Sequence, residues 1–224
     1  MLIVHMSLRD AYLSCYNGVQ LCAWSIVLVR AMLAAQQSGD YRSVFMTSYI
    51  DLTIAQALTA LETMHALCGI VKSPVLANVL QFAGRTHALA VTLLLPELQR
   101  TPASAALVFT WAGSDVVRYS YGLGSVVAKS PLAGRRRWYS ALTWLRYSLF
   151  IIMYPCGALA EAALLYDALP ASKRGWGRVT MPNAWNFSWD YHAFLIVVLL
   201  AYAPLFLQLY THMLRQRRRK LKAE

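Results

Sequence analysis

Three residues that can exchange protons, Tyr147, Tyr154 and Glu161, stand seven positions apart within the apolar stretch 139–166. Seven residues make nearly two turns of an α-helix of about 3.6 residues per turn, so the three side chains lie along one helix face. A carboxylate at the centre of a lipid bilayer costs roughly 2.5 to 3.5 kcal/mol, so its presence in such a stretch indicates a function. A phenol paired with a carboxyl group suits acid and base catalysis.

Pro155 follows Tyr154 directly, and Gly157 comes two residues later. Pro155 has no N–H to bond to the carbonyl of Ile151, so we expect the helix to kink between the tyrosine and the glutamate. Such a bend would shorten the rise of about 10 Å between Tyr154 and Glu161, taken at about 1.5 Å per residue.

The composition is that of an integral membrane protein. Of the 224 residues, 58% are hydrophobic and 14% are charged, and the mean hydropathy is +0.43. The charged residues gather between apolar blocks, which is typical of several membrane-spanning segments rather than one anchor. The net charge of +11 comes from loops and the C-terminal tail, so we expect no nucleic acid partner.

The cysteines have no metal-ligand spacing, and we expect them to be small buried apolar residues. No metal and no cofactor is therefore predicted. The four are Cys15, Cys22, Cys68 and Cys156.

Six apolar segments are each long enough to cross a hydrocarbon core of about 30 Å. They show no sustained alternation, and backbone polar groups in lipid must be satisfied within a segment, so we expect helices. The sequence predicts an all-α polytopic membrane protein, with residues 1–224 as one domain and residues 213–224 as a basic cytosolic tail. The six predicted segments are residues 11–35, 44–70, 75–96, 102–124, 141–166 and 190–212.

Counts of lysine and arginine predict the orientation of these segments. With six spans both termini share a side, which carries twelve of these residues against five on the opposite side. Positive charge favours the cytosol, so both termini are predicted to be cytosolic.

Charged residues also occur inside the predicted spans. Glu62 and His65 can pair as neighbours three residues apart on a helix, and this local pair is the alternative to a catalytic role. Arg85 lies a turn or more into the third segment, where it either extends to the membrane surface or pairs with Glu62 across the bundle.

Trp111, Asp115, Arg118 and Tyr119 share one face of the fourth segment. Two interpretations remain open. Asp115 and Arg118 form an ion pair within the helix, or Arg118 or Tyr119 helps to form the wall of an active site.

The sequence WLRY at residues 144–147, followed by YPCGALAE at residues 154–161, resembles the signature of the 3-hydroxyacyl-CoA dehydratases of very-long-chain fatty acid elongation, once named protein tyrosine phosphatase-like proteins. Further blocks from residue 12 to the tail are similar to that family. At position 115 this chain has aspartate where the family pattern has glutamate.

The resemblance implies that Tyr154 and Glu161 are the catalytic pair. We predict that Glu161 takes the C2 proton of the substrate and that Tyr154 either protonates the departing C3 hydroxyl or orients it by donating a hydrogen bond, with the reverse assignment left open. Substrate-binding or supporting roles are predicted for Glu62, Asp115, Arg118, Tyr119, Arg146, Tyr147 and Gly157.

The resemblance also implies a setting. The substrate is a 3-hydroxyacyl-CoA, and the expected partners are membrane lipid and the condensing enzyme, ketoreductase and enoyl reductase of the elongation cycle. The basic loop 129–137 either only fixes orientation or also contacts the phosphates of coenzyme A. Lys220 and Lys222 have the spacing of a dilysine retrieval signal, so we expect a multi-pass protein of the endoplasmic reticulum.

Two other functions are compatible with buried charges in a helical bundle. A transporter would line its path with acids such as Asp51 and Glu62, but it predicts an inverted internal repeat, and none is visible between the two halves. A catalytically silent scaffold for the elongation enzymes would keep the same residues without turnover.

Overall fold

The computed structural model describes residues 7–128 and 137–222 of the chain. Lys129, Arg135 and Arg136 of the basic loop and residues 223–224 of the tail lie outside this described part. The longer elements are α1 (Leu8–Ser38), α2 (Val44–Leu58), α3 (Ala60–Leu67), α4 (Val75–Leu94), α5 (Pro102–Val127), α6 (Arg137–Asp167) and α8 (Tyr191–Lys222). The short elements are η1 (Tyr41–Ser43), η2 (Pro96–Leu98) and α7 (Leu169–Lys173).

The all-α prediction is confirmed. Each of the six predicted segments is helical, and the only strand-like pairing in the described part of the chain is an isolated bridge between Val179 and Trp189. Helix ends follow local sequence signals. Thr101 accepts a hydrogen bond from the backbone N–H of Ser104 at the start of α5, and Gly39 ends α1 with a φ of 62°, a conformation that glycine adopts without strain.

The predicted single helix over residues 44–70 is wrong at one point, because it breaks at Thr59. The Thr59 hydroxyl donates to the carbonyl of Gln56 at 2.6 Å, and the Thr59 backbone N–H donates to the same carbonyl at 3.1 Å. These bonds replace the regular helical ladder at this position. The break gives α2 and α3, and it places polar side chains of both helices opposite α4.

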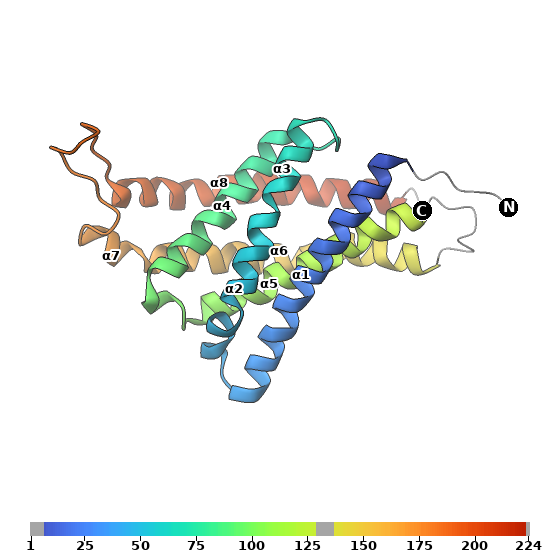
Figure 1. Ribbon diagram of the computed structural model, residues 1–224, viewed down its shortest axis with the longest axis horizontal. Helices are drawn as coiled ribbons and strands as arrows, with labels where there is room; N and C mark the ends of the chain where they lie inside the picture. Colours follow the sequence, from blue (N-terminus) through green and yellow to red (C-terminus); the bar gives the residue numbers. More distant parts are fainter. Residues whose placement is uncertain (1–6, 129–136, 223–224) are drawn as a thin grey trace.

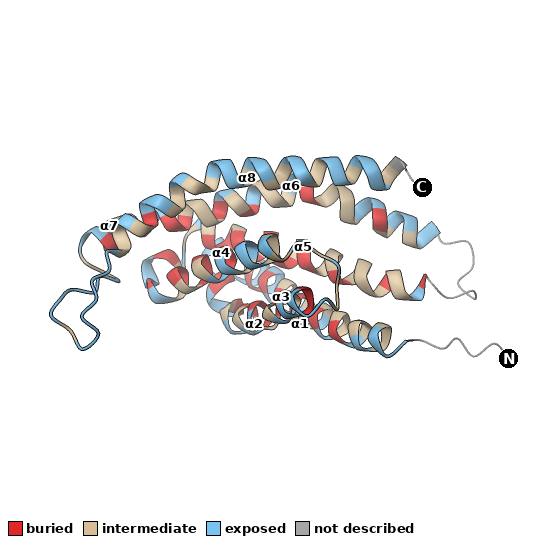
Figure 2. Cartoon of the chain, turned by 90° about the horizontal axis from the view of Figure 1, so that it is seen from above, coloured by how far each residue is buried: buried red, intermediate tan, exposed pale blue. Residues whose placement is uncertain are grey.

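α5 lies in the middle of the molecule and packs against α1, α2 and α6. Figure 2 shows α8 on the outside against α6, then α4 and α5, and then α1 to α3 on the opposite side. Two glycines allow close helix contacts. A Cβ on Gly122 would meet the Asn17 side chain of α1 at 2.8 Å, and a Cβ on Gly157 would meet Thr110 Oγ1 of α5 at 3.3 Å.

Within the described residues, four helical segments are long and apolar enough to cross a membrane: Leu8–Ser38, Tyr41–Leu67, Arg137–Lys173 and Tyr191–Leu221. α4 and α5 are not among them. Polar residues such as Gln81, Arg85 and Asp115 lower the hydropathy of these two helices, and the buried ones among these residues face the interior. The outer face of α8 is exposed and apolar (Figure 2), as expected for a surface in contact with lipid.

The prediction that the cysteines are buried is wrong. All four are exposed and unpaired. They lie on helix surfaces or at a helix end, where a small apolar residue needs no partner.

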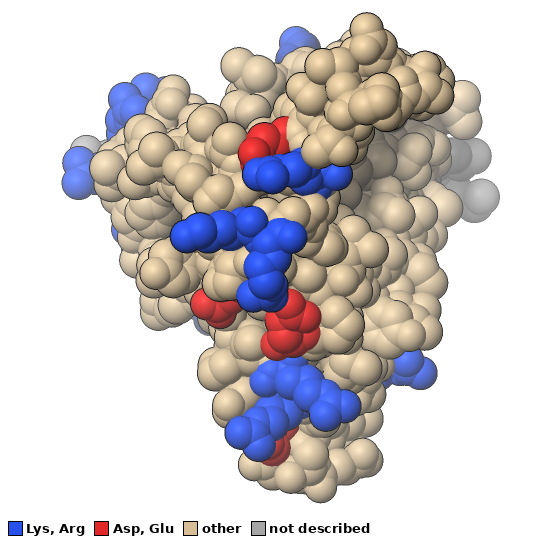
Figure 3. All heavy atoms as spheres, turned by 90° about the vertical axis from the view of Figure 1, so that its left-hand side faces the viewer, with Lys and Arg blue, Asp and Glu red and all other residues tan. Residues whose placement is uncertain are grey.

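Asp190 precedes α8 in a loop at the end of the molecule shown in Figure 3, where basic and acidic side chains adjoin. Its carboxylate accepts a hydrogen bond from the backbone N–H of Ala193 at 3.2 Å and one from Arg178 at 2.8 Å. The hydrogen bond from the Ala193 N–H lowers the pKa of Asp190 below its ordinary value, and Arg178 lowers it further.

This lowered pKa makes part of the stability depend on pH. A carboxyl group of this kind stabilises the fold above its unfolded pKa of about 3.9 and loses that contribution as the pH falls through the lower folded value. Asp190→Asn keeps an acceptor for Ala193 but cannot titrate. We expect wild type to melt above this variant at pH 7, and the difference to shrink below about pH 4. Thermal melts followed by tryptophan fluorescence between pH 7 and pH 3 test this prediction. A difference in melting temperature between the two proteins that does not change with pH would contradict it.

Candidate active site

The carboxyl group of Glu161 is held from two sides. Its Oε1 accepts a hydrogen bond from the indole N–H of Trp111 on α5, and its Oε2 accepts one from the hydroxyl of Tyr202 on α8, each at 2.8 Å. Indole nitrogen is a donor only, and an ionised carboxylate is an acceptor only. This set of partners therefore suits a Glu161 carboxylate whose orientation is fixed.

Tyr154 lies against the same neighbouring helix as Glu161. Its ring stacks with Phe206 and Tyr210 of α8, at centroid distances of 5.3 and 6.2 Å. No side chain in the described part of the chain hydrogen-bonds the Tyr154 hydroxyl. The structure thus directs both residues of the predicted pair toward α8 and leaves the phenol free to bind another molecule.

Pro155 leaves α6 continuous from Arg137 to Asp167. The carbonyl of Ile151, which loses its helical donor to the proline, lies 3.3 Å from the Tyr210 hydroxyl, which donates to it. Tyr210 therefore satisfies a carbonyl one turn before Tyr154 and joins α8 to α6 at this point.

The contribution of α8 was missed by the sequence interpretation. Tyr202, Phe206 and Tyr210 stand four residues apart, a spacing that places them on one face of a helix. That aromatic stripe is the signal that would have pointed to the contact with α6. Its partner residues on α6 become known only from the packing.

The interior holds a network of ion pairs beside this site. Arg85 of α4 lies 2.8 Å from Asp115 of α5, and Arg118 lies 2.6 Å from Glu62 of α3. The predicted pair within α5 is confirmed, because Arg118 Nε lies 3.0 Å from Asp115 Oδ1, although the N–H is not aligned for a hydrogen bond. Two arginines thus share the Asp115 carboxylate.

Two predicted pairings are wrong. Glu62 does not pair with His65, whose Nε2 instead lies 2.7 Å from the Tyr12 hydroxyl. Arg85 neither reaches the surface nor pairs with Glu62, because it is buried and bound to Asp115. In each case the observed partner comes from another helix: α1 supplies Tyr12 to His65, and α5 supplies Asp115 to Arg85.

Arg85 connects the ion pairs to Glu161. Its guanidinium lies over the ring of Trp111 at 4.2 Å and near the ring of Trp24 at 5.1 Å. A cation over an indole ring is favourable, and more so when water is excluded. Trp111 also donates to Glu161. Asp115 therefore holds Arg85, and Arg85 contacts the indole ring that orients the Glu161 carboxylate.

The other residues that the sequence predicts to bind or support the substrate lie on α5 and α6. Tyr119 accepts a hydrogen bond from Arg118 at 2.7 Å, and the Tyr147 ring meets Tyr121 edge-on at 5.9 Å. Arg146 lines a small hollow together with Ser114 and other residues between α5 and α6. Gly157 lets α6 approach α5 beside Trp111.

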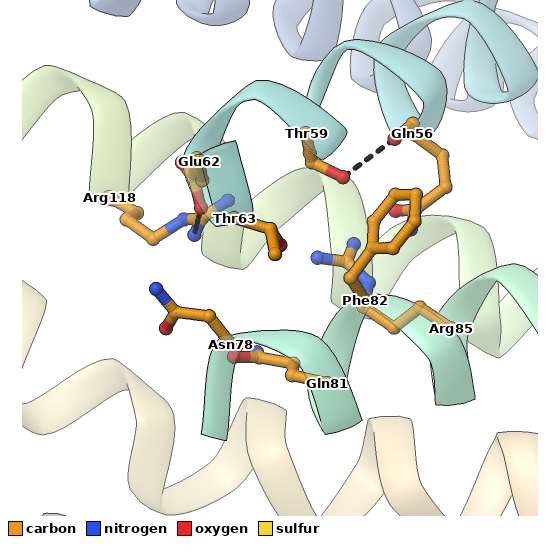
Figure 4. A pocket seen from close by; sticks show the side chains of 9 residues that line it. All are labelled: Gln56, Thr59, Glu62, Thr63, Asn78, Gln81, Phe82, Arg85 and Arg118. Carbon is orange, nitrogen blue, oxygen red and sulfur yellow. Dashed lines mark hydrogen bonds and ion pairs between the residues drawn. The ribbon is translucent and has the colours of Figure 1, made fainter. Parts of the chain in front are cut away.

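A larger hollow lies between α2, α3, α4 and α5 (Figure 4). Neither it nor the smaller hollow is lined by Tyr154 or Glu161. Among residues 7–128 and 137–222, no three His, Cys, Asp or Glu side chains are grouped as metal ligands. The lining residues of the larger hollow are Gln56, Thr59, Glu62, Thr63, Asn78, Gln81, Phe82, Arg85 and Arg118.

These features define a multi-pass helical membrane protein with paired charges and a fixed carboxyl group in its interior. Residues 56–223 match the family model described as "Protein tyrosine phosphatase-like protein, PTPLA". The chain belongs to this family.

Curated relatives extend the match over nearly the whole chain. It is 36% identical to very-long-chain (3R)-3-hydroxyacyl-CoA dehydratase 2 of Mus musculus, over 94% of this chain and 81% of the relative. It is 34% identical to very-long-chain (3R)-3-hydroxyacyl-CoA dehydratase PASTICCINO 2 of Arabidopsis thaliana, over 95% and 94% of the two chains. No solved structure matches the chain.

Proposed function

We propose that this protein removes water from very-long-chain 3-hydroxyacyl-CoA to give the trans-2-enoyl-CoA, the third step of the fatty acid elongation cycle. The names of its relatives support the reaction class. The observation that carries the proposal is the pairing of a doubly hydrogen-bonded Glu161 carboxyl group with a free Tyr154 hydroxyl, both facing α8.

Glu161 is the base in this proposal. A group that accepts hydrogen bonds at both oxygens has the partners of a carboxylate, and it can take the C2 proton that the thioester carbonyl makes acidic. The proton goes to Oε2, because Oε1 faces the donor-only indole of Trp111, and the Tyr202 hydroxyl can turn to accept it.

Tyr154 is the acid. Its hydroxyl donates a proton to the C3 hydroxyl, which leaves as water while the C2–C3 double bond forms. Phe206 and Tyr210 hold its ring by stacking. The acyl chain would extend along the apolar surfaces of α6 and α8.

The membrane arrangement that fits this reaction is a bundle of six spans with both termini in the cytosol. α4 and α5 cross the membrane inside the bundle, because their buried polar faces are covered by neighbouring helices. The start of α1 and the end of α8 lie at the same end of the molecule (Figure 1). The protein then resides in the endoplasmic reticulum, next to the condensing enzyme, the ketoreductase and the enoyl reductase.

The test is turnover by the purified protein in detergent. Wild type should convert a 3-hydroxyacyl-CoA to the enoyl product, measured by mass spectrometry, and Tyr154→Phe should lower kcat by on the order of 10²-fold or more, because the proton donor is lost. Tyr166→Phe is the matched control, since Tyr166 is an exposed tyrosine on the same helix and should retain full activity. A wild type that folds but forms no enoyl product would favour the silent scaffold.

A further inference from the structure

The hydroxyl of Tyr202 reaches Glu161 from a helix on the outside of the molecule (Figure 2). α8 packs against α6 and α7, and residues 203–205, which follow Tyr202, are exposed. Tyr202, Phe206 and Tyr210 are only partly exposed, because the stripe that they form lies against α6. The first residue of this stripe thus ends on the carboxyl group that the proposed reaction uses as its base.

α8 is joined to the other helices by bonds that do not involve Tyr202. The Tyr191 hydroxyl at the start of α8 lies 2.7 Å from His87 Nε2 of α4. The Tyr210 hydroxyl donates to a backbone carbonyl of α6 at 3.3 Å. Because these bonds hold α8 at two other points, the bond of Tyr202 to Glu161 is not needed to dock the helix, and its effect is to be sought at the carboxyl group.

Two hydrogen bonds from different helices fix the plane of this carboxyl group. With only the Trp111 N–H on Oε1, the Glu161 carboxyl group could still turn about its bond to Cγ, and the Tyr202 hydroxyl on Oε2 prevents this. A base must lie within hydrogen-bond reach of the proton that it takes, and a shift of about 1 Å can cost on the order of 10²-fold in rate. The direction in which Oε2 points therefore depends on Tyr202.

The two donors differ once the C2 proton has arrived. An indole N–H only donates, whereas a tyrosine hydroxyl both donates and accepts. A carboxylate oxygen can accept more than one hydrogen, so the Tyr202 hydroxyl leaves room on Oε2 for the proton. Tyr202 can thus stay bonded to Glu161 before and after the proton transfer, which Trp111 could not do at that oxygen.

We propose that Tyr202 is a positioning residue for the Glu161 base and that α8 thereby completes the active site. The proposal rests on the dehydratase function proposed above. Tyr202 takes no proton from the substrate. Its hydroxyl keeps Oε2 directed at C2 of the acyl chain and stays bonded to this oxygen throughout the reaction.

Tyr202→Phe tests this role, because it removes the hydroxyl and keeps the ring. In the full chain in detergent, kcat per folded molecule should fall by about 10- to 10²-fold, as expected for a lost hydrogen bond to a charged group. KM should stay within about twofold of wild type, since the hydroxyl is bonded to the base and not to the substrate. Size-exclusion chromatography gives the folded fraction, so a mere loss of folded protein would not change this kcat.

Tyr191→Phe is the matched control, since it removes the hydroxyl of another α8 tyrosine that contacts a neighbouring helix. Tyr191 lies about 16 Å from Tyr202 along α8, at about 1.5 Å per residue, and this variant should retain wild-type kcat. 4-Aminophenylalanine at position 202 returns an N–H donor to the same ring and should restore kcat to within about threefold of wild type. Tyr202→Leu provides a second protein without the donor if Tyr202→Phe does not fold.

Wild-type kcat in Tyr202→Phe, or equal losses of kcat in Tyr202→Phe and Tyr191→Phe, would overturn the positioning role while the dehydratase function stands. A loss confined to KM, or no recovery with 4-aminophenylalanine, would do the same. A wild-type protein that folds but forms no enoyl product would overturn both proposals.

Discussion

Replacing Glu161 with glutamine should lower kcat by on the order of 10³- to 10⁴-fold, since the amide cannot accept the C2 proton. The substitution preserves the shape of the site. The glutamine carbonyl can accept from Trp111, and its amide N–H can donate to the Tyr202 oxygen. Binding of the substrate should therefore persist, and the loss should appear in kcat rather than in KM.

Initial rates of enoyl-CoA formation at several substrate concentrations separate these two parameters. Glu97→Gln is the matched control, because it makes the same change at an exposed carboxylate of η2. Retention of more than a tenth of the wild-type kcat in Glu161→Gln would rule out Glu161 as the base.

Replacing Asp115 with asparagine should lower the free energy of unfolding by about 3–5 kcal/mol, because it leaves a buried guanidinium without its partner. The Asp115 side chain is 4% exposed and that of Arg85 is 11% exposed. Little water can therefore solvate the guanidinium once its partner is lost. Arg118 retains Glu62, whereas Arg85 keeps only the faces of Trp24 and Trp111. Activity should fall as well, because Arg85 supports Trp111.

Unfolding in mixed detergent, followed by tryptophan fluorescence, measures this loss. The control is Asp190→Asn, which removes the charge from an ion pair whose side chains are both 46% exposed. Exposed pairs contribute little, since water and salt screen them. Equal destabilisation by the two substitutions would show that the buried network does not hold α4 to α5.

The positions of the helices, and the placement of Tyr154 and Glu161 on one helix, were predictable from the sequence. Apolar runs of more than twenty residues must be helical in lipid, and the spacing of Tyr154 and Glu161 places both side chains on one face of such a helix. The ion pair of Asp115 with Arg118 was also predictable, since residues three apart on a helix are neighbours.

The cross-helix partners were not predictable in the same way. Glu62 has His65 as its local neighbour but binds Arg118, and Arg85 binds Asp115. A long side chain reaches several helices, and which acid it meets depends on helix rotation and on close contacts such as that of Gly157 with Thr110. The break at Thr59 was missed because threonine is common within helices, and only its hydroxyl bond to Gln56 reveals the interruption.

The sequence by itself determined that this is a helical membrane protein with a phenol and a carboxyl group on one helix. That information is local, because hydropathy and the helical repeat act over neighbouring residues. Only the tertiary structure decided that Trp111 and Tyr202 hold Glu161 and that Arg85 supports Trp111. The two contacts of Glu161 join residues 50 and 41 positions apart, and Arg85 comes from α4. All of them form only when α4, α5, α6 and α8 pack together.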